Sequence, residues 1–240
     1  IQNSQKWIFE ATPDISTHLA DLEQNHLKKE NIIDGVFLTH AHIGHYTGLM
    51  YFGREALGKQ GTKVYAMPKM KTFIESNGPW SQLVTIKNID IKPLQNDSTI
   101  VLNNQLKVTP FLVPHRDEFS ETVGYKISGP NKTALFIPDI DKWHRWKHSI
   151  IEEVKKVDYA FLDATFFNQK EVKRAMTEVP HPFIEETASL FKNESIETKN
   201  KVIFIHFNHT NPALLEQSKE KSALEKLGFR FAVEGQNYGL

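Results

Sequence analysis

The sequence contains no cysteine among its 240 residues. Disulfides, thiolate zinc sites and cysteine nucleophiles are therefore excluded, and any metal ion must be held by histidine, carboxylate or water. Long hydrophobic runs are also absent, because none approaches the roughly eighteen residues that a membrane span needs. We therefore expect a soluble protein with no membrane partner.

Neither sign of charge is in excess, because 29 Lys and Arg residues balance 29 Asp and Glu residues. This balance excludes a global basic field that would recruit nucleic acid, so we expect a small-molecule substrate and no nucleic-acid partner. No signal peptide is visible, but the chain opens at Ile1 rather than Met. The compartment stays open between cytoplasm and export, and the oligomeric state stays open with a dimer as one option.

Three histidines, His40, His42 and His45, crowd into six residues of the stretch GVFLTHAHIGHYTGL. They follow residues 35–38, a short apolar run that predicts a buried strand. His40 and His42 lie two residues apart, so their side chains can converge on one cation, and neutral imidazole suits zinc and iron. The alternative is three unrelated polar residues in a surface loop. A cluster at a strand end favours the metal site.

Three further ligand-type residues also follow predicted strands: His115, Asp139 and His206. Each one alone is weak evidence, since a strand-end aspartate is more often a cap or turn residue. Their recurrence at separate strand ends, together with the histidine cluster, favours a metal centre built from distant segments of the chain.

The hydrophobic pattern predicts an α/β (α+β) protein with two sheets flanked by helices in one domain, residues 1–240. The expected helices span residues 15–27, 46–57, 69–76, 143–156, 182–191 and 212–227. The expected strands span residues 6–11, 35–38, 63–67, 84–91, 100–102, 106–112, 121–127, 134–137, 159–162, 201–205 and 229–233. Gly129-Pro130-Asn131 predicts a hairpin between two of these strands.

The motif His40-Ala41-His42-Ile43-Gly44-His45, with the three later residues in order, resembles the metallo-β-lactamase-fold superfamily. The signature of that superfamily is H-x-H-x-D-H, then a histidine, a bridging aspartate and a last histidine. Within it the chain resembles the pyrroloquinoline-quinone biosynthesis protein B (PqqB) group, through FEATPDI, VPHRDEFSETVGYKI, FIPDID and FIHFNHTNP. The resemblance covers nearly the whole chain and implies a four-layer αβ/βα sandwich. It also implies that an N-terminal strand and the cysteines of that group are missing from this chain.

The resemblance implies one metal ion bound by three histidines and a second bound by two histidines, with an aspartate bridging. The first set is His40, His42 and His115, and the second is His45 and His206 with Asp139. Zinc is expected, with manganese or iron as alternatives. Gly44 stands where the family has an aspartate, so one or two ions are expected, and three protein ligands still suffice for an open second site. His209 could compensate, although a supporting or structural role is the commoner one at its position.

Four residues are expected to act around the metal ions. Asp139 would orient the nucleophile, and His181 would protonate the leaving group, with a solvent-exposed residue at a helix start as an equally weighted alternative. Arg116 could clamp an anionic substrate, but an ion pair with a neighbouring carboxylate is slightly favoured. Asp163 would fix the tautomer of a ligand histidine. His144 and His148 are predicted on the solvated face of a helix.

Three functions remain open at this stage. The leading one is a metallo-hydrolase that uses a metal-activated water on a small ester, phosphodiester or lactone. The second is an iron-dependent hydroxylase in cofactor biosynthesis, which the resemblance to the PqqB group implies. The third is a non-catalytic metal-containing carrier, which Gly44 favours.

Overall fold

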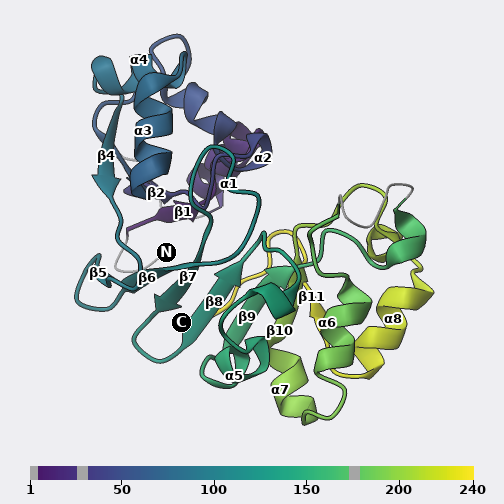
Figure 1. Ribbon diagram of the computed structural model, residues 1–240. Coiled ribbons are helices and arrows are strands. Elements are labelled where there is room, and N and C mark those ends of the chain that lie inside the picture. Colours follow the sequence, from purple (N-terminus) through teal and green to yellow (C-terminus); the bar gives the residue numbers. More distant parts are fainter. Residues whose placement is uncertain (1–4, 26–31, 173–178) are drawn as a thin grey trace. The chain divides into compact units, whose positions relative to one another are not determined.

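The computed structural model describes residues 5–25, 32–172 and 179–240, and the chain forms two compact units (Figure 1). Unit 1 consists of Ile1–Ser98 and Asp117–Val123, and unit 2 consists of Thr99–Arg116 and Gly124–Leu240. Each unit has its own cluster of buried hydrophobic side chains. Within the described ranges, no helix is both long enough and apolar enough to cross a bilayer.

Unit 1 contains, in its described part, a four-stranded parallel sheet. Its strands are β1 (Trp7–Phe9), β2 (Gly35–Phe37), β3 (Thr62–Ala66) and β4 (Ile89–Pro93), in that order across the sheet. Parallel neighbours need crossover connections, and helices supply them here. Because the strands run the same way, the residues that follow β1 and β2 emerge at the same edge.

The helices of unit 1 agree only in part with the sequence-based expectation. They are α1 (Ile15–Gln24), α2 (Ile43–Tyr46), the 3₁₀ helix η1 (Thr47–Phe52), α3 (Pro68–Ser76) and α4 (Trp80–Thr85). The predicted helix 46–57 is wrong beyond Phe52, because the backbone at Gly53 is extended. The predicted strand 84–91 is wrong at its start, which ends α4. The end of predicted helix 15–27 lies partly outside the described residues.

Unit 2 is built on a seven-stranded mixed sheet, counted over the described residues. Its strands are β5 (Ile100–Val101), β6 (Lys107–Leu112), β7 (Val123–Ser128), β8 (Thr133–Ile137), β9 (Tyr159–Asp163), β10 (Val202–Ile205) and β11 (Arg230–Phe231). The strands β7 and β8 form the predicted antiparallel hairpin, whereas β8, β9, β10 and β11 run parallel. The carboxyl ends of β8, β9 and β10 are therefore neighbours.

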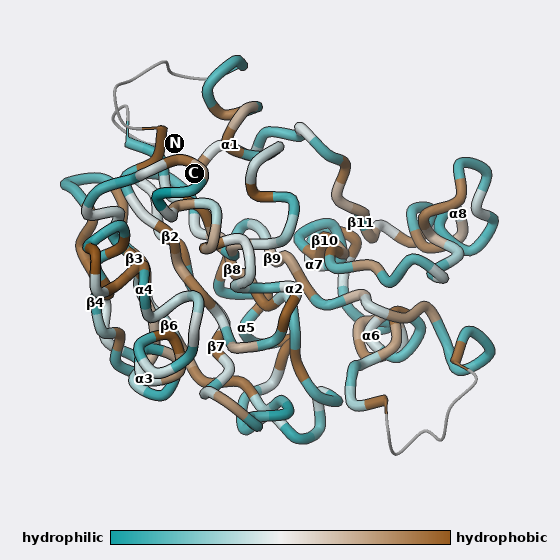
Figure 2. Tube along the Cα trace, turned by 90° about the horizontal axis from the view of Figure 1, so that it is seen from above, coloured by the Kyte–Doolittle hydropathy of each residue, from teal (hydrophilic) through white to brown (hydrophobic). Residues whose placement is uncertain are grey.

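The helical segments of unit 2 are shorter than the sequence pattern predicts. They are η2 (Trp143–Arg145), α5 (Ile150–Lys155), η3 (Gln169–Glu171), α6 (Ile184–Leu190), α7 (Ile196–Lys201), η5 (Pro212–Leu214) and α8 (Lys219–Lys226). The predicted helices 143–156 and 212–227 are each split, because Ser149 and Ser218 cap new helices with their side chains. Figure 2 shows both hydrophilic and hydrophobic stretches along α8.

Candidate metal centre

The histidine loop of unit 1 is held by a carboxylate that follows the neighbouring strand. The parallel register pairs Phe9 with Phe37, so Glu10 emerges beside the start of the loop. The Thr39 amide donates to Glu10 Oε1 over 3.1 Å, and the Glu10 side chain is buried. Glu10 has a φ of 81°, a left-handed conformation that a non-glycine residue adopts only at a cost. The surrounding structure therefore fixes this carboxylate in place.

Two histidines of this loop have Nδ1 engaged by a neighbouring side chain. His45 Nδ1 lies 2.6 Å from Glu10 Oε2, and His40 Nδ1 lies 2.9 Å from Thr39 Oγ1. Such partners orient a ligating imidazole and fix its tautomer. With Nδ1 engaged, Nε2 is the nitrogen that a metal ion would bind in both residues.

His42 has the opposite arrangement. Its Nε2 lies 3.0 Å from Glu118 Oε2, and its Nδ1 lies 2.8 Å from Nε2 of His40. Two nitrogens on one tetrahedral zinc ion, at Zn–N distances of about 2.0–2.1 Å, lie roughly 3.3 Å apart. If His40 Nε2 and His42 Nδ1 moved apart by about half an ångström, both could bind the same zinc ion. The donor atoms of this loop therefore fit the expected metal.

In unit 2, three acidic or imidazole residues occupy the carboxyl ends of adjacent parallel strands. Asp139 follows β8, Asp163 ends β9 and His206 follows β10, with Ile205 in register with Asp163. The carboxyl ends of parallel strands are where open α/β sheets bind ligands. His206 has a φ of 62°. Like Glu10, it therefore adopts a left-handed backbone conformation that costs energy in a non-glycine residue.

Asp163 connects several groups at this edge. The carboxylate is entirely buried and accepts hydrogen bonds from the Ile140 amide at 3.1 Å and from the amide and hydroxyl of Thr165 at 2.9 and 2.7 Å. Its Oδ2 also lies 2.9 Å from Nδ1 of His181. Thr165 Oγ1 in turn lies 2.8 Å from His206 Nδ1, so Asp163 reaches this predicted ligand through the threonine.

His181 lies between two carboxylates. Its Nδ1 is 3.0 Å from Asp139 Oδ1 and 2.9 Å from Asp163 Oδ2, and the three residues form a tight group. Burial by itself would lower the pKa of His181. The charge of Asp163 and the hydrogen bonds with Asp139 and Asp163 outweigh burial and raise the pKa from 6.5 to about 10. The imidazole therefore holds its proton at neutral pH.

His115 has the same kind of support as the other predicted ligands. Its Nδ1 lies 3.3 Å from Asp141 Oδ1, and its Nε2 lies 3.4 Å from Asp139 Oδ1. Arg145 Nη1 lies 2.8 Å from Asp141 Oδ2. Burial would raise the pKa of Asp141, but the hydrogen bonds from His115 and Arg145 outweigh it and lower the pKa.

Comparison with known proteins identifies the family to which the chain belongs. A family model described as a beta-lactamase superfamily domain matches residues 6–207. The chain belongs to the β-lactamase superfamily. Coenzyme PQQ synthesis protein B of Acinetobacter baylyi (strain ATCC 33305 / BD413 / ADP1) is 24% identical over 261 residues, covering 97% of this chain and 83% of the relative. The protein of that name from Gluconobacter oxydans (strain 621H) is 25% identical, covering 99% and 84%.

Solved structures of this superfamily share the fold. The Zn(2+)-bound PqqB from Methylobacterium extorquens matches with a TM-score of 0.79 at 21% identity, covering 100% of this chain and 85% of that chain. The short form of human tRNase Z matches with a TM-score of 0.57 at 16% identity, covering 87% and 84%. The predicted superfamily, the likeness to PqqB and the metallo-β-lactamase fold are thus confirmed.

Several site residues of this superfamily member were outside the sequence-based prediction. Glu10, Glu118, Asp141 and Thr165 each contact a predicted ligand, and their roles depend on strand pairing or loop conformation. The sequence signal for three of them was that Glu10, Glu118 and Asp141 fall in the FEATPDI, VPHRDEFSETVGYKI and FIPDID stretches. Of the remaining candidates, Arg116 and His209 are exposed. The grouping of the ligands of both units into one centre stays a prediction.

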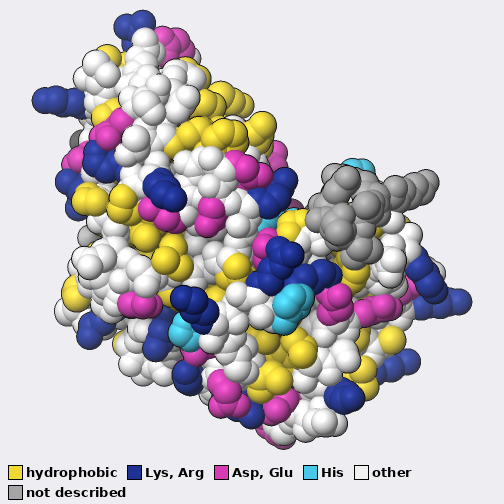
Figure 3. Space-filling view, viewed as in Figure 1, with side chains coloured by type: hydrophobic (Ala, Val, Ile, Leu, Met, Phe, Trp, Pro, Cys, Tyr) yellow, Lys and Arg dark blue, Asp and Glu magenta, His cyan; other side chains and the backbone are white. Residues whose placement is uncertain are grey.

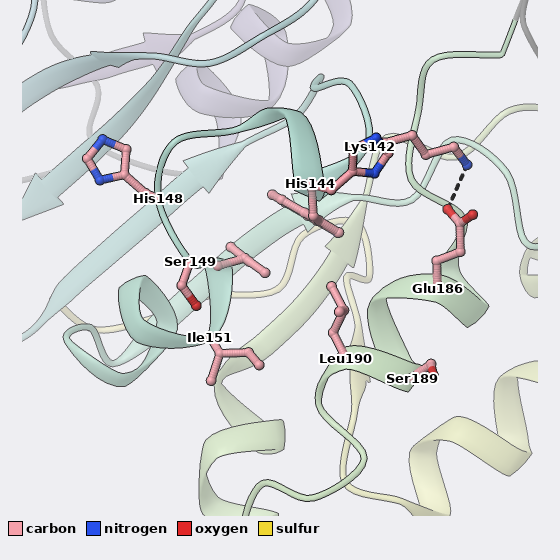
Figure 4. A pocket seen from close by; sticks show the side chains of 10 residues that line it. Lys142, His144, His148, Ser149, Ile151, Glu186, Ser189 and Leu190 are labelled. Atoms are coloured by element: carbon pink, nitrogen blue, oxygen red, sulfur yellow. Dashed lines mark hydrogen bonds and ion pairs between the residues drawn. The ribbon is translucent and has the colours of Figure 1, made fainter.

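A cavity of about 560 Å³ lies in unit 2 beside the segment that follows Asp141 (Figure 4). Lys142 pairs with Glu186 over 2.6 Å, as the dashed line shows. His144 and His148 line this cavity and are exposed, as predicted, but His144 lies in η2 and His148 precedes α5. The two histidines therefore do not lie on the one continuous helix that the sequence predicts over residues 143–156.

Proposed function

We propose that the chain is a metal-dependent hydrolase that acts on a small ester, phosphodiester or lactone. The ligands in this proposal are His40, His42, His45, His115, His206 and Asp139. The observation that carries it is the pattern of hydrogen bonds. His40, His45, His115 and His206 all have Nδ1 engaged by a neighbouring threonine or carboxylate, which prepares Nε2 for a metal ion.

The residues present fit a divalent cation, since they offer five imidazoles and a carboxylate without any thiolate. The zinc-bound PqqB supports zinc as the metal to test first. When bound, such an ion supplies Lewis acidity and lowers the pKa of a coordinated water to about 7. Gly44 offers no side-chain ligand, so we propose that the ion held by His45 and His206 binds more weakly than the other.

In this proposal His181 acts as the proton donor for the leaving group. Its Nδ1 proton is held between Asp139 and Asp163, which keeps the ring protonated and fixes its orientation. In the part of the chain that the structure describes, Nε2 of His181 makes no hydrogen bond. The Nε2 proton is therefore the one available for transfer to substrate.

The test is an assay of zinc- and manganese-loaded protein against bis(4-nitrophenyl) phosphate, a set of lactones, simple esters and a β-lactam. We expect turnover of at least one class, abolished by a chelator and restored by the metal. Protein that binds stoichiometric metal and turns over none of these classes would contradict hydrolysis. Elemental analysis of the same samples gives the number of ions per chain.

A second candidate function is an iron-dependent hydroxylation in coenzyme PQQ synthesis, and the names of the curated relatives favour a role in that synthesis. The imidazole-rich donor set accepts ferrous iron as well as zinc. The test is anaerobic loading with Fe(II), followed by measurement of oxygen uptake with candidate precursors of the coenzyme. Uptake that responds to a precursor would favour this function, and uptake that no precursor stimulates would remove it.

The face in Figure 3 carries Lys and Arg side chains interspersed with Asp and Glu, rather than a field of one sign. We therefore retain a small molecule as the proposed substrate, in line with the balanced charge of the chain.

A further inference from the structure

An exposed aromatic ring stands next to the histidine loop of unit 1. Phe119 is 60% exposed, which is unusual for so large an apolar side chain. Its ring centroid lies 5.6 Å from that of Phe73 in helix α3. Phe73 contacts Tyr46 at 5.3 Å, and Tyr46 contacts Trp80 at 4.8 Å. A row of four aromatic rings therefore runs from the surface into the unit and ends outward at Phe119.

This aromatic row is attached to the predicted ligands at two points. Glu118, the residue before Phe119, pairs with His42, and Tyr46 directly follows His45. The same segment is fixed to the loop by two more hydrogen bonds. The Ala41 amide donates to Ser120 Oγ over 2.9 Å, and the Val123 amide donates to the carbonyl of Thr39 over 3.2 Å. Phe119 is thus held at a defined place relative to the loop.

A cavity of about 450 Å³ opens between Phe119 and helix α3. Phe73 and Phe119 give it aromatic walls, and Lys69 and Glu118 give it charged ones. Glu118 pairs with His42, but the Lys69 ammonium forms no ion pair within the described ranges. The volume is in the range of small-molecule sites, so it suits one or two rings rather than a folded partner.

We propose that this cavity binds a planar aromatic group of an anionic substrate, and that this group stacks on Phe119. The inference rests on the proposed hydrolase function and names the substrate class. Aromatic rings prefer offset or edge-to-face contacts with other rings, and the exposed face of Phe119 is available for one. Phe119 is then a specificity-determining residue, and the hydrogen bonds of Ser120 and Val123 with the histidine loop fix its position relative to that loop.

The test compares two substrates with the same scissile bond and the same leaving group. Bis(4-nitrophenyl) phosphate and methyl 4-nitrophenyl phosphate differ only in the group that stays on phosphorus. We expect a higher kcat/KM for the aryl compound. In Phe119→Ala the aryl compound should lose about five- to tenfold, mainly through KM, and the methyl compound less than twofold. Phe119→Tyr should keep the preference, and Leu215→Ala, another exposed apolar position, serves as the control.

A binding measurement separates this proposal from the hydrolase function. Calorimetry of metal-loaded protein with phenylphosphonate and methylphosphonate needs no turnover. If the protein hydrolyses nothing, but binds phenylphosphonate more tightly and loses that preference in Phe119→Ala, the aromatic site stands and the hydrolase proposal fails. An unchanged aryl preference in Phe119→Ala, or no binding of phenylphosphonate at millimolar concentration, would overturn the aromatic site.

Discussion

The two units build their histidine sets in different ways. In unit 1, His40, His42 and His45 come from one loop of six residues, and Glu10 supports it from the next strand. In unit 2, Asp139, Asp163 and His206 come from segments far apart in the sequence. They lie at the same sheet edge because β8, β9 and β10 are adjacent and parallel. The set of unit 1 therefore depends on local loop conformation, whereas that of unit 2 depends on the order of strands.

This difference has a consequence for the supporting carboxylates. Glu10 bonds one histidine and one amide, so its loss should affect mainly metal affinity. Asp163 bonds two amides, a hydroxyl and a histidine from three segments of unit 2, so its loss should affect stability as well. Unit 2 also places histidines between pairs of carboxylates, with His181 between Asp139 and Asp163 and His115 between Asp139 and Asp141.

The largest effect is expected at His181, the proposed proton donor, which belongs to the histidine set of unit 2. His181→Gln should lower kcat roughly 10² to 10⁴-fold on a substrate with a poor leaving group, because general-acid catalysis is lost. The loss should be much smaller with 4-nitrophenolate as leaving group, which needs no proton. Steady-state kinetics on a series of aryl phosphodiesters of rising leaving-group pKa measures it, with the exposed His144→Gln as the matched control. Equal losses across the series would rule out proton donation.

The next largest effect is expected at Asp163, because the stability of unit 2 should depend on this buried carboxylate. Asp163→Ala should lower the free energy of unfolding of the metal-free protein by about 3–5 kcal/mol, because buried donors and a buried imidazolium lose their partner. Asp163→Asn keeps the shape and one acceptor, so it should cost about 1–3 kcal/mol. Urea unfolding followed by circular dichroism compares the two. If the alanine variant lost less than about 1 kcal/mol of unfolding free energy, the order of the strands would be enough to stabilise this sheet edge without Asp163.

A smaller effect is expected in unit 1, where the carboxylate supports one ligand. Glu10→Gln removes the charge that orients His45 but keeps an amide of the same shape. Zinc affinity of the site that uses His45 should fall about 10- to 100-fold, with little change in unfolding temperature. Competition with a chromophoric chelator measures the affinity, and Glu55→Gln, an exposed glutamate of the same unit, is the control. Unchanged affinity would mean that the loop orients His45 without Glu10.

The same contrast explains what could be predicted from the sequence. The loop of unit 1 was visible because its histidines are neighbours in the chain, and His115, Asp139 and His206 were visible because each follows an apolar run. Glu10 was missed because its role arises from the pairing of β1 with β2, which no local pattern encodes. The long helices predicted over 143–156 and 212–227 failed for a related reason. Internal serine caps and tertiary hydrogen bonds, such as that from Trp143 to Thr187, override helical periodicity there.

The smallest effect is expected at Gly44, where the loop of unit 1 lacks the acidic ligand that its family signature would supply. A Cβ at Gly44 would meet no atom within 4 Å, so Gly44→Asp should fold without strain. The added carboxylate should tighten the weaker metal site about tenfold, because an anionic oxygen joins its ligands. Elemental analysis after gel filtration at limiting zinc should then show more ions per chain than in the wild type. Gly44→Ala separates the effect of the side-chain charge from that of the backbone. If the aspartate variant retains no more zinc than the alanine variant, the position does not face a metal ion, and unit 1 contributes to one site only.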